Sequence, residues 1–165
     1  MDVGIRKLNE NDVTILTGFH LSIKGEFSRM QHKEDFQMRT DVRNWLSGNK
    51  HHFWGAFSGG RLVGIIRFDL NHKGKKNTAY WGLSYLRKRY RHQAIGKELA
   101  ERGWDFLKSK GVTHVVGDTG PRNREMQSFF KSKGGKRTAV SFLLQQAKNA
   151  IGSNKGSIKF KLRVK

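Results

Sequence analysis

The chain has 165 residues, no cysteine, a hydrophobic fraction of 36% and a formal net charge of +20 at pH 7. This length suits one domain with a sizeable core, and the lack of cysteine excludes a disulfide framework, a thiolate nucleophile and a cysteine zinc site. The sequence has no run of 18 apolar residues, so it predicts no membrane span. Residues 1–7 lack the apolar core of a signal peptide, so we expect a cytoplasmic protein.

The predicted elements follow from apolar periodicity and turn residues. In chain order they are a strand at 5–8, helices at 12–23 and 35–46, strands at 53–57, 62–68 and 79–86, a helix at 95–110, a strand at 112–116, a helix at 123–133, and strands at 138–144 and 157–164. Asn11 and Asp12 are expected to cap the first helix. The side of the second helix expected to face the core consists of Phe36, Val42, Trp45 and Leu46.

The positive charge is concentrated in the later part of the chain. Residues 1–50 carry 8 Lys and Arg against 7 Asp and Glu, residues 51–110 carry 13 against 4, and residues 111–165 carry 12 against 2. Such an excess attracts polyanions. Two interpretations stay open: a cationic surface that only keeps the protein soluble, or a surface that binds phosphate.

The turn between the strand at 79–86 and the helix at 95–110 is the most informative stretch. It is rich in cations, and it contains the small residues Ala94 and Gly96 where the helix begins. Unpaired backbone N–H groups and the helix dipole both favour an anion at such a place. The sequence therefore predicts a pyrophosphate-binding turn.

Two motifs at this turn and beyond it resemble those of a known family. Residues 91–96, Arg-His-Gln-Ala-Ile-Gly, resemble the pyrophosphate motif Gln/Arg-x-x-Gly-x-Gly/Ala of the GNAT superfamily of acyl-CoA N-acyltransferases, and a second motif follows at Asn123, Phe129-Phe130 and Gly134-Gly135. With the order of elements, the resemblance covers about residues 3–145. It implies an α+β fold with a central, mostly antiparallel mixed sheet that is splayed between its fourth and fifth strands and flanked by helices. One domain over residues 1–165 would hold a cofactor half at about 79–135 and a basic C-terminal hairpin at about 136–165.

The resemblance also implies acetyl-CoA as the acyl donor, lying where the fourth and fifth strands splay apart. Tyr85 and Leu86 would pair with the pantetheine amides, and one of their N–H groups would polarise the thioester carbonyl. Asn123 would contact the pantetheine arm, or serve only as a helix cap. Phe130 is also expected among the cofactor-binding residues. The residues implied at the pyrophosphate are Arg91, His92, Gln93, Ala94, Ile95, Gly96 and Lys97.

Three positions depart from the family pattern. Ala94 replaces a glycine, and its methyl group either crowds the phosphate or is accommodated in a helical conformation. The strand at 79–86 has no Asp or Glu, so Asp118 is the best candidate for the general base, with a loop-capping role as its alternative. Phe130 stands where many members have a proton-donating Tyr, which leaves Tyr85, Ser128 or water to protonate the thiolate, unless the thiolate leaves unaided.

The acceptor is predicted to be a primary amine. The net charge disfavours a polycation, so an amine on charged tRNA, the ribosome or another nucleic-acid-bound protein fits better. Near the C-terminus five cations alternate with apolar residues and would share one strand face: Lys155, Lys159, Lys161, Arg163 and Lys165. That face either follows phosphates or only discourages aggregation at an edge strand.

Several further expectations concern the acceptor side and the partners. Acidic residues of the first two helices, Glu26, Glu34 and Asp35, would frame the acceptor, and Trp81 and Tyr85 either line its cleft or pack in the core. The histidine spacing gives no metal set, and a homodimer is left open. The alternative function is a catalytically impaired GNAT scaffold that acts as a basic nucleic-acid- or protein-binding inhibitor module.

Overall fold

The computed structural model describes residues 2–26, 34–120, 123–137 and 158–164. Its internal contacts divide the chain into two compact units. Unit 1 comprises Met1–Phe68 and Leu83–Gly103, and unit 2 comprises Asp69–Gly82 and Trp104–Lys165. The expectation of one domain over the whole chain stays a prediction, and the units are described separately below.

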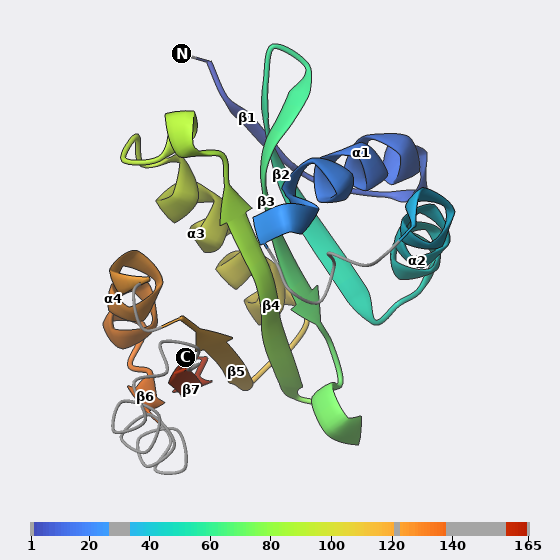
Figure 1. Cartoon of the computed structure of the whole chain (residues 1–165). Coiled ribbons are helices and arrows are strands. Elements are labelled where there is room, and N and C mark those ends of the chain that lie inside the picture. Colours follow the sequence, from blue (N-terminus) through green and yellow to red (C-terminus); the bar gives the residue numbers. More distant parts are fainter. Residues whose placement is uncertain (1, 27–33, 121–122, 138–157, 165) are drawn as a thin grey trace, which may run out of the picture. The chain divides into compact units, whose positions relative to one another are not determined.

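The described strands form one mixed sheet, and helices lie between several of them in the chain (Figure 1). In chain order they are β1 (Gly4–Lys7), η1 (Glu10–Asp12), α1 (Val13–Ile23), η2 (Lys24–Glu26), α2 (Asp35–Ser47), β2 (His51–Ser58), β3 (Arg61–Asp69), η3 (His72–Gly74), β4 (Thr78–Leu86), η4 (Lys88–Tyr90), α3 (Ile95–Ser109), β5 (His114–Thr119), α4 (Arg124–Ser132), β6 (Lys136–Arg137) and β7 (Ile158–Arg163). Within the described residues the strands follow the order β1-β2-β3-β4-β5-β7-β6. The β4–β5 pair is parallel, whereas β1–β2, β5–β7 and β6–β7 are antiparallel. The predicted α+β fold with a mixed sheet and flanking helices is confirmed.

Unit 1 is built around the contact of α1 and α2 with each other and with β2 (Figure 1). Leu16, Met38 and Phe53 from these elements are fully buried in one cluster. The prediction that Phe36 faces this core is wrong, because its side chain is 71% exposed. In α2 the buried positions are Met38 and Val42, four residues apart on one helix face, and Phe36 is two residues, about 200°, away from that face.

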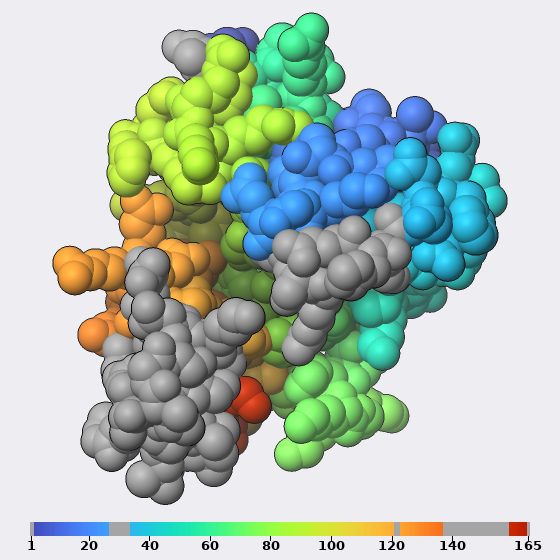
Figure 2. Space-filling view, viewed as in Figure 1, coloured from blue at the N-terminus to red at the C-terminus, as the bar shows by residue number. Residues whose placement is uncertain are grey.

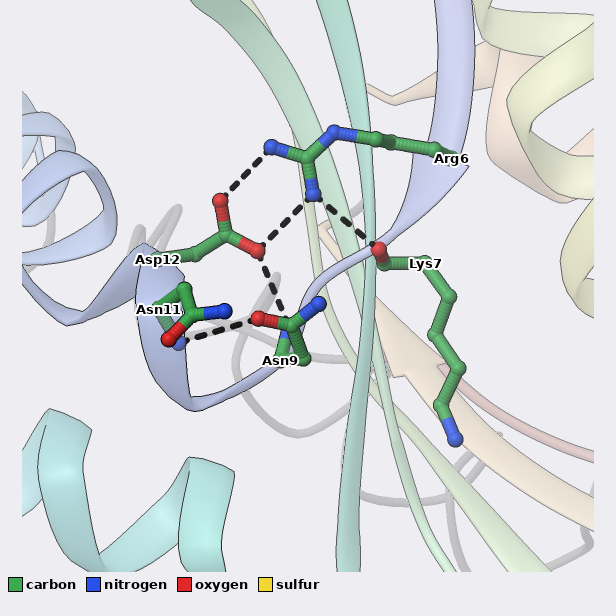
Figure 3. Close-up of polar contacts among 5 residues, drawn as sticks. All are labelled: Arg6, Lys7, Asn9, Asn11 and Asp12. Carbon is green, nitrogen blue, oxygen red and sulfur yellow. Dashed lines mark hydrogen bonds and ion pairs between the residues drawn. The ribbon is translucent and has the colours of Figure 1, made fainter.

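The entry into α1 is fixed by a salt bridge that the sequence did not predict (Figure 3). Arg6 donates to both carboxylate oxygens of Asp12, over 2.8 and 2.6 Å, and the Asn9 backbone N–H donates to the same carboxylate over 2.9 Å. Asp12 is only 3% exposed, and its bond with Arg6 holds the pKa of its carboxyl below the ordinary value. Asp12 occupies the N-cap position of α1, as expected, but makes no side-chain cap bond there, and Asn9 rather than Asn11 caps the 3-10 turn η1.

Unit 2 has a sheet with one apolar side and one polar side. Along β7, Phe160 and Leu162 are 1% exposed while the residues between them are exposed. Helix α4 covers the apolar side through Phe130, whose ring lies 5.5 Å from that of Trp81 and 5.1 Å from that of Phe160. Of the two alternatives for Trp81, the buried core position is the one observed, at 1% exposure.

Strand β5 runs over His114–Thr119 rather than residues 112–116, so it extends past the expected end and includes Asp118. The predicted strand at 138–144 and the connector at 145–156 lie outside the described residues. No helix among the described residues is long and apolar enough to cross a membrane.

Candidate functional site

The cationic turn that follows β4 is held in unit 1 by two buried side chains. Tyr90, at the end of η4, and Ile95, at the start of α3, are 6% and 7% exposed and share a cluster with Ala56 and Val63. The residues between these anchors are half-buried or exposed. In Figure 2 the yellow-green atoms of this segment lie at the surface. Burial thus fixes both ends of the turn, and its middle is left half-buried or exposed.

The middle of the turn has an unusual backbone conformation. His92 and Ala94 both lie in the left-handed region, with φ of 62° and 61°. L-residues with a Cβ rarely adopt this conformation, which costs about 1 kcal/mol or more. A turn that alternates left- and right-handed residues directs successive N–H groups into an anion-binding concavity. Of the two alternatives for Ala94, a helical conformation is wrong, because its φ is positive.

Helix α3 begins at the predicted residue, Ile95, and contributes the remaining donors. Its first backbone hydrogen bond runs from the Glu98 N–H to the Ala94 carbonyl, over 3.0 Å. The N–H groups of Ile95, Gly96 and Lys97 belong to the first turn, which has no carbonyl partners within the helix. A Cβ added at Gly96 would meet only a methyl of Leu86, at 3.8 Å. The fold itself therefore does not require a glycine there.

The polar side chains of the turn are folded back onto its own backbone. The Nε of Arg91 donates to the Leu86 carbonyl over 2.9 Å, and its guanidinium lies 5.6 Å from the centre of the Tyr85 ring. The Nε2 of Gln93 donates to the Arg89 carbonyl over 2.8 Å. These bonds tie the turn to the end of β4 and stiffen the predicted anion site.

Tyr85 is held by a contact that sequence analysis missed. Its hydroxyl donates to Glu26 of η2 over 2.5 Å, and its ring packs edge-on against Phe19. Burial, followed by the bond to Glu26, raises the pKa of the Tyr85 phenol. A raised pKa makes this phenol a weaker acid. Its predicted role as a proton donor stays a prediction, and the bond links the end of β4 to one of the acidic residues expected around the acceptor.

Asp118 has a defined partner within unit 2. The hydroxyl of Tyr80, on β4, donates to its Oδ1. Tyr80 lies opposite Val116 in the parallel register, so Asp118, two residues further, points to the same side of the sheet. His72 stacks on the Tyr80 ring, with centroids 5.1 Å apart. The carboxylate that we assign as the base is thus oriented by a strand and a phenol rather than by a loop.

The other predicted cofactor residues of unit 2 lie on α4. Asn123 is exposed, and its side chain accepts from the Met126 N–H over 3.1 Å, so its helix-capping role is observed. Phe130 is fully buried. Their contacts with acetyl-CoA stay predictions. In the part of the chain that the structure describes, no three His, Asp or Glu side chains gather as a metal site would need.

Comparison with known proteins identifies the family. The family model described as Acetyltransferase (GNAT) family matches residues 20–134. The chain belongs to this family. The match includes the turn at 91–97, Asp118 and the second motif as far as Gly134, so of the two motifs that carried the sequence resemblance only Gly135 lies beyond it.

Relatives of this GNAT chain agree with its fold. It is 30% identical over 105 residues to N-acetyltransferase 8 of Rattus norvegicus, a match that covers 62% of this chain and 47% of that protein, so the chain matches about half the length of this relative. The structure is similar to PaiA N-acetyltransferase of Thermoplasma acidophilum in complex with coenzyme A (TM-score 0.68, 20% identity, 99% of each chain). It is also similar to the ribosomal-protein-S18-alanine N-acetyltransferase of Escherichia coli (TM-score 0.67, 15% identity, 99% of this chain and 94% of that one).

Two contacts of the candidate site could not have been found from the sequence. The partners Tyr80 and Asp118 are 38 residues apart in the chain, and Glu26 and Tyr85 are 59 apart. The first pair depends on the β4–β5 register, for which neither strand carries a specific signal.

Proposed function

We propose that this GNAT protein is an acetyl-CoA-dependent N-acetyltransferase that moves an acetyl group to a primary amine. The observation that carries the proposal is the turn before α3, with two left-handed residues, open first-turn amides and the uncrowded Gly96. These features suit the pyrophosphate of coenzyme A, because main-chain donors at a helix start bind a phosphate without a specific side chain. Arg91, His92 and Lys97 add positive charge beside it.

The acceptor amine must lose a proton before it can attack, since a primary amine with a pKa of about 10 is mostly charged at neutral pH. We assign this step to Asp118. Its Oδ1 accepts from Tyr80, which would orient the carboxylate in the way that a second group orients a catalytic base. The amine nitrogen then forms a bond to the thioester carbonyl carbon, and the carbon–sulfur bond breaks to release the thiolate of coenzyme A.

The negative charge that develops on the carbonyl oxygen needs a hydrogen-bond donor. A backbone N–H at Tyr85 or Leu86 is proposed for this role, and such a donor typically contributes about 3 kcal/mol to the transition state. The Leu86 carbonyl already accepts from Arg91, which would hold the strand end in place. For the thiolate, Tyr85, Ser128 and water remain the candidate proton donors.

The acceptor is proposed to be an amine carried on nucleic acid or on a nucleoprotein such as the ribosome, in the cytoplasm. The support is electrostatic: a net charge of +20 repels small polycations and attracts polyanions at long range. No single residue determines this assignment.

Turnover and binding together test the proposal. The protein should bind coenzyme A in calorimetry and release free thiol from acetyl-CoA when aminoacylated tRNA or ribosomes are added, with the acetylated amine located by mass spectrometry. Gly96→Asp should abolish coenzyme A binding by placing a carboxylate at the pyrophosphate. Binding to polyanions without any response to coenzyme A would instead favour the non-catalytic scaffold.

The role of Asp118 has its own variant and control. Asp118→Asn keeps an acceptor for the Tyr80 hydroxyl but cannot take a proton, so turnover should fall by about 10²- to 10⁴-fold while coenzyme A affinity is unchanged. Asp105→Asn removes an exposed carboxylate of α3 in the same unit and should keep wild-type turnover. Equal rates for both variants would exclude Asp118 as the base.

A further inference from the structure

The polar side of the unit 2 sheet carries a set of exposed cations, which we call the cationic face. It consists of Lys136, Lys159, Lys161 and Arg163. The register places Lys136 and Val116 opposite Lys161, Asp118 opposite Lys159, and His114 opposite Arg163. Residues that lie opposite each other across a ladder point to the same side of the sheet. Three strands therefore contribute to one surface.

The other side of this sheet is closed by protein. Phe160 and Leu162, which alternate with the β7 cations, are 1% exposed and pack in the core with Phe130 of α4. Because α4 occupies that side, its own exposed cation Lys131 lies behind the sheet relative to the cationic face. Unit 2 thus separates two groups of lysines by geometry, which provides an internal control.

Aromatic rings accompany the cations on the same side. Tyr80 shares the side of Val116 and Asp118, and His72 stacks on it with an interplanar angle of 21°. Both rings are half-buried, and the loop from η3 continues with the exposed residues Lys73, Lys75 and Lys76. Proteins that bind single-stranded nucleic acid combine aromatic rings, on which the bases stack, with a basic strip that contacts the phosphates.

We propose that the cationic face of unit 2 binds single-stranded nucleic acid. An anionic membrane fits less well, since membrane-surface binding needs apolar side chains that insert, and the apolar residues of β7 face the core. The cationic face would be the surface that holds the polyanion, and its link to the acceptor rests on the proposed function. Asp118 lies within this surface, where a carboxylate repels phosphate and attracts an amine.

The test is the binding of a fluorescein-labelled 20-nucleotide single-stranded RNA to the full chain, by anisotropy between 50 and 200 mM KCl. Each lost phosphate contact reduces the slope of log affinity against log salt by about 0.7. The double variant Lys161→Gln/Arg163→Gln should therefore lower the slope by about 1.4 and weaken binding at least tenfold at low salt. The matched double variant Lys108→Gln/Lys131→Gln, which removes two exposed cations of α3 and α4, should keep the wild-type slope.

His72→Ala separates stacking from charge. It should weaken RNA binding about tenfold, since one stacked base contributes about 1–3 kcal/mol, and leave the binding of inorganic polyphosphate, which has no bases, unchanged. Equal losses in the two double variants, or phosphatidylserine vesicles bound through the cationic face with no RNA binding, would overturn the proposal. Because no acetyl-CoA is present, this result is independent of the thiol-release assay that tests the enzyme.

Discussion

Replacing Gly96 by alanine should raise stability and keep coenzyme A binding, because the family motif accepts glycine or alanine at this position. A Cβ at this position would meet one atom, the Leu86 Cδ2 at 3.8 Å, which is an ordinary van der Waals contact. Gly96 is the second residue of α3, where alanine is the better helix former. We expect a gain of about 0.5 kcal/mol, half of the full glycine-to-alanine difference, because the site is in the first turn. For a chain of this size the melting temperature should rise by about 1–2 °C.

Coenzyme A affinity should fall in Gly96→Asp rather than in Gly96→Ala. The added carboxylate would lie beside the first-turn amides and repel the pyrophosphate, which would lose at least one charge-assisted hydrogen bond. Such a bond contributes about 1.5–3 kcal/mol, so the dissociation constant should rise by at least about 10- to 100-fold. Differential scanning calorimetry measures the first quantity, and isothermal titration calorimetry with coenzyme A measures the second.

Gly18→Ala is the matched control. Gly18 is an exposed glycine of α1, and a Cβ there meets no atom within 4 Å. This variant should gain about 1 kcal/mol of stability and bind coenzyme A as the wild type does. If Gly96→Asp binds coenzyme A with unchanged affinity, the turn is not the pyrophosphate site and the reasoning is refuted.

Three further predictions concern contacts in unit 1. Asp12→Asn should lower the free energy of unfolding by about 2–3 kcal/mol at pH 7, because it leaves Arg6 without its buried partner. The pKa of Asp12 is depressed in the folded state, so the stability difference from wild type in urea unfolding should be full above about pH 5 and shrink as the pH falls through the folded-state pKa; a difference independent of pH would contradict this. Glu26→Gln should lower the raised pKa of Tyr85, as measured by ultraviolet titration against Tyr85→Phe; an unchanged curve would show that burial alone is responsible. Gly103→Ala should destabilise by about 1–3 kcal/mol in thermal unfolding, since its Cβ would lie 2.3 Å from a buried phenylalanine ring, and a stable variant would mean that the packing there relaxes.

Local features of the sequence predicted the helix start and the turn well. Ile95 is the first residue of α3, as expected from apolar periodicity, and the strands predicted at 53–57 and 62–68 flank Gly59 and Gly60, whose φ of 53° and 72° suit a tight turn. Both signals act within a few residues, through backbone freedom and the burial of one helix face. The prediction for Phe36 is wrong because this apolar residue, in the first turn of α2, lies off the buried face of the helix.

The partners of the charged and phenolic side chains could not be predicted from the sequence. Arg6 pairs with Asp12, Tyr80 with Asp118 and Tyr85 with Glu26, and each pair depends on how separate elements come together. A carboxylate in a sequence indicates only that a charge is present. Its burial and its partner, and hence whether it stabilises the fold or takes part in chemistry, depend on the three-dimensional surroundings.

The sequence alone determined the family, the α+β fold and the location of the predicted anion-binding turn, because these depend on short-range periodicity and on motifs within single segments. The tertiary structure decided how that turn is held. Burial of Tyr90 and Ile95 fixes its two ends, so the backbone between them must close in few residues and places Ala94 in a conformation that its own side chain disfavours. The energy for this strained backbone comes from packing of the flanking residues, which no local pattern specifies.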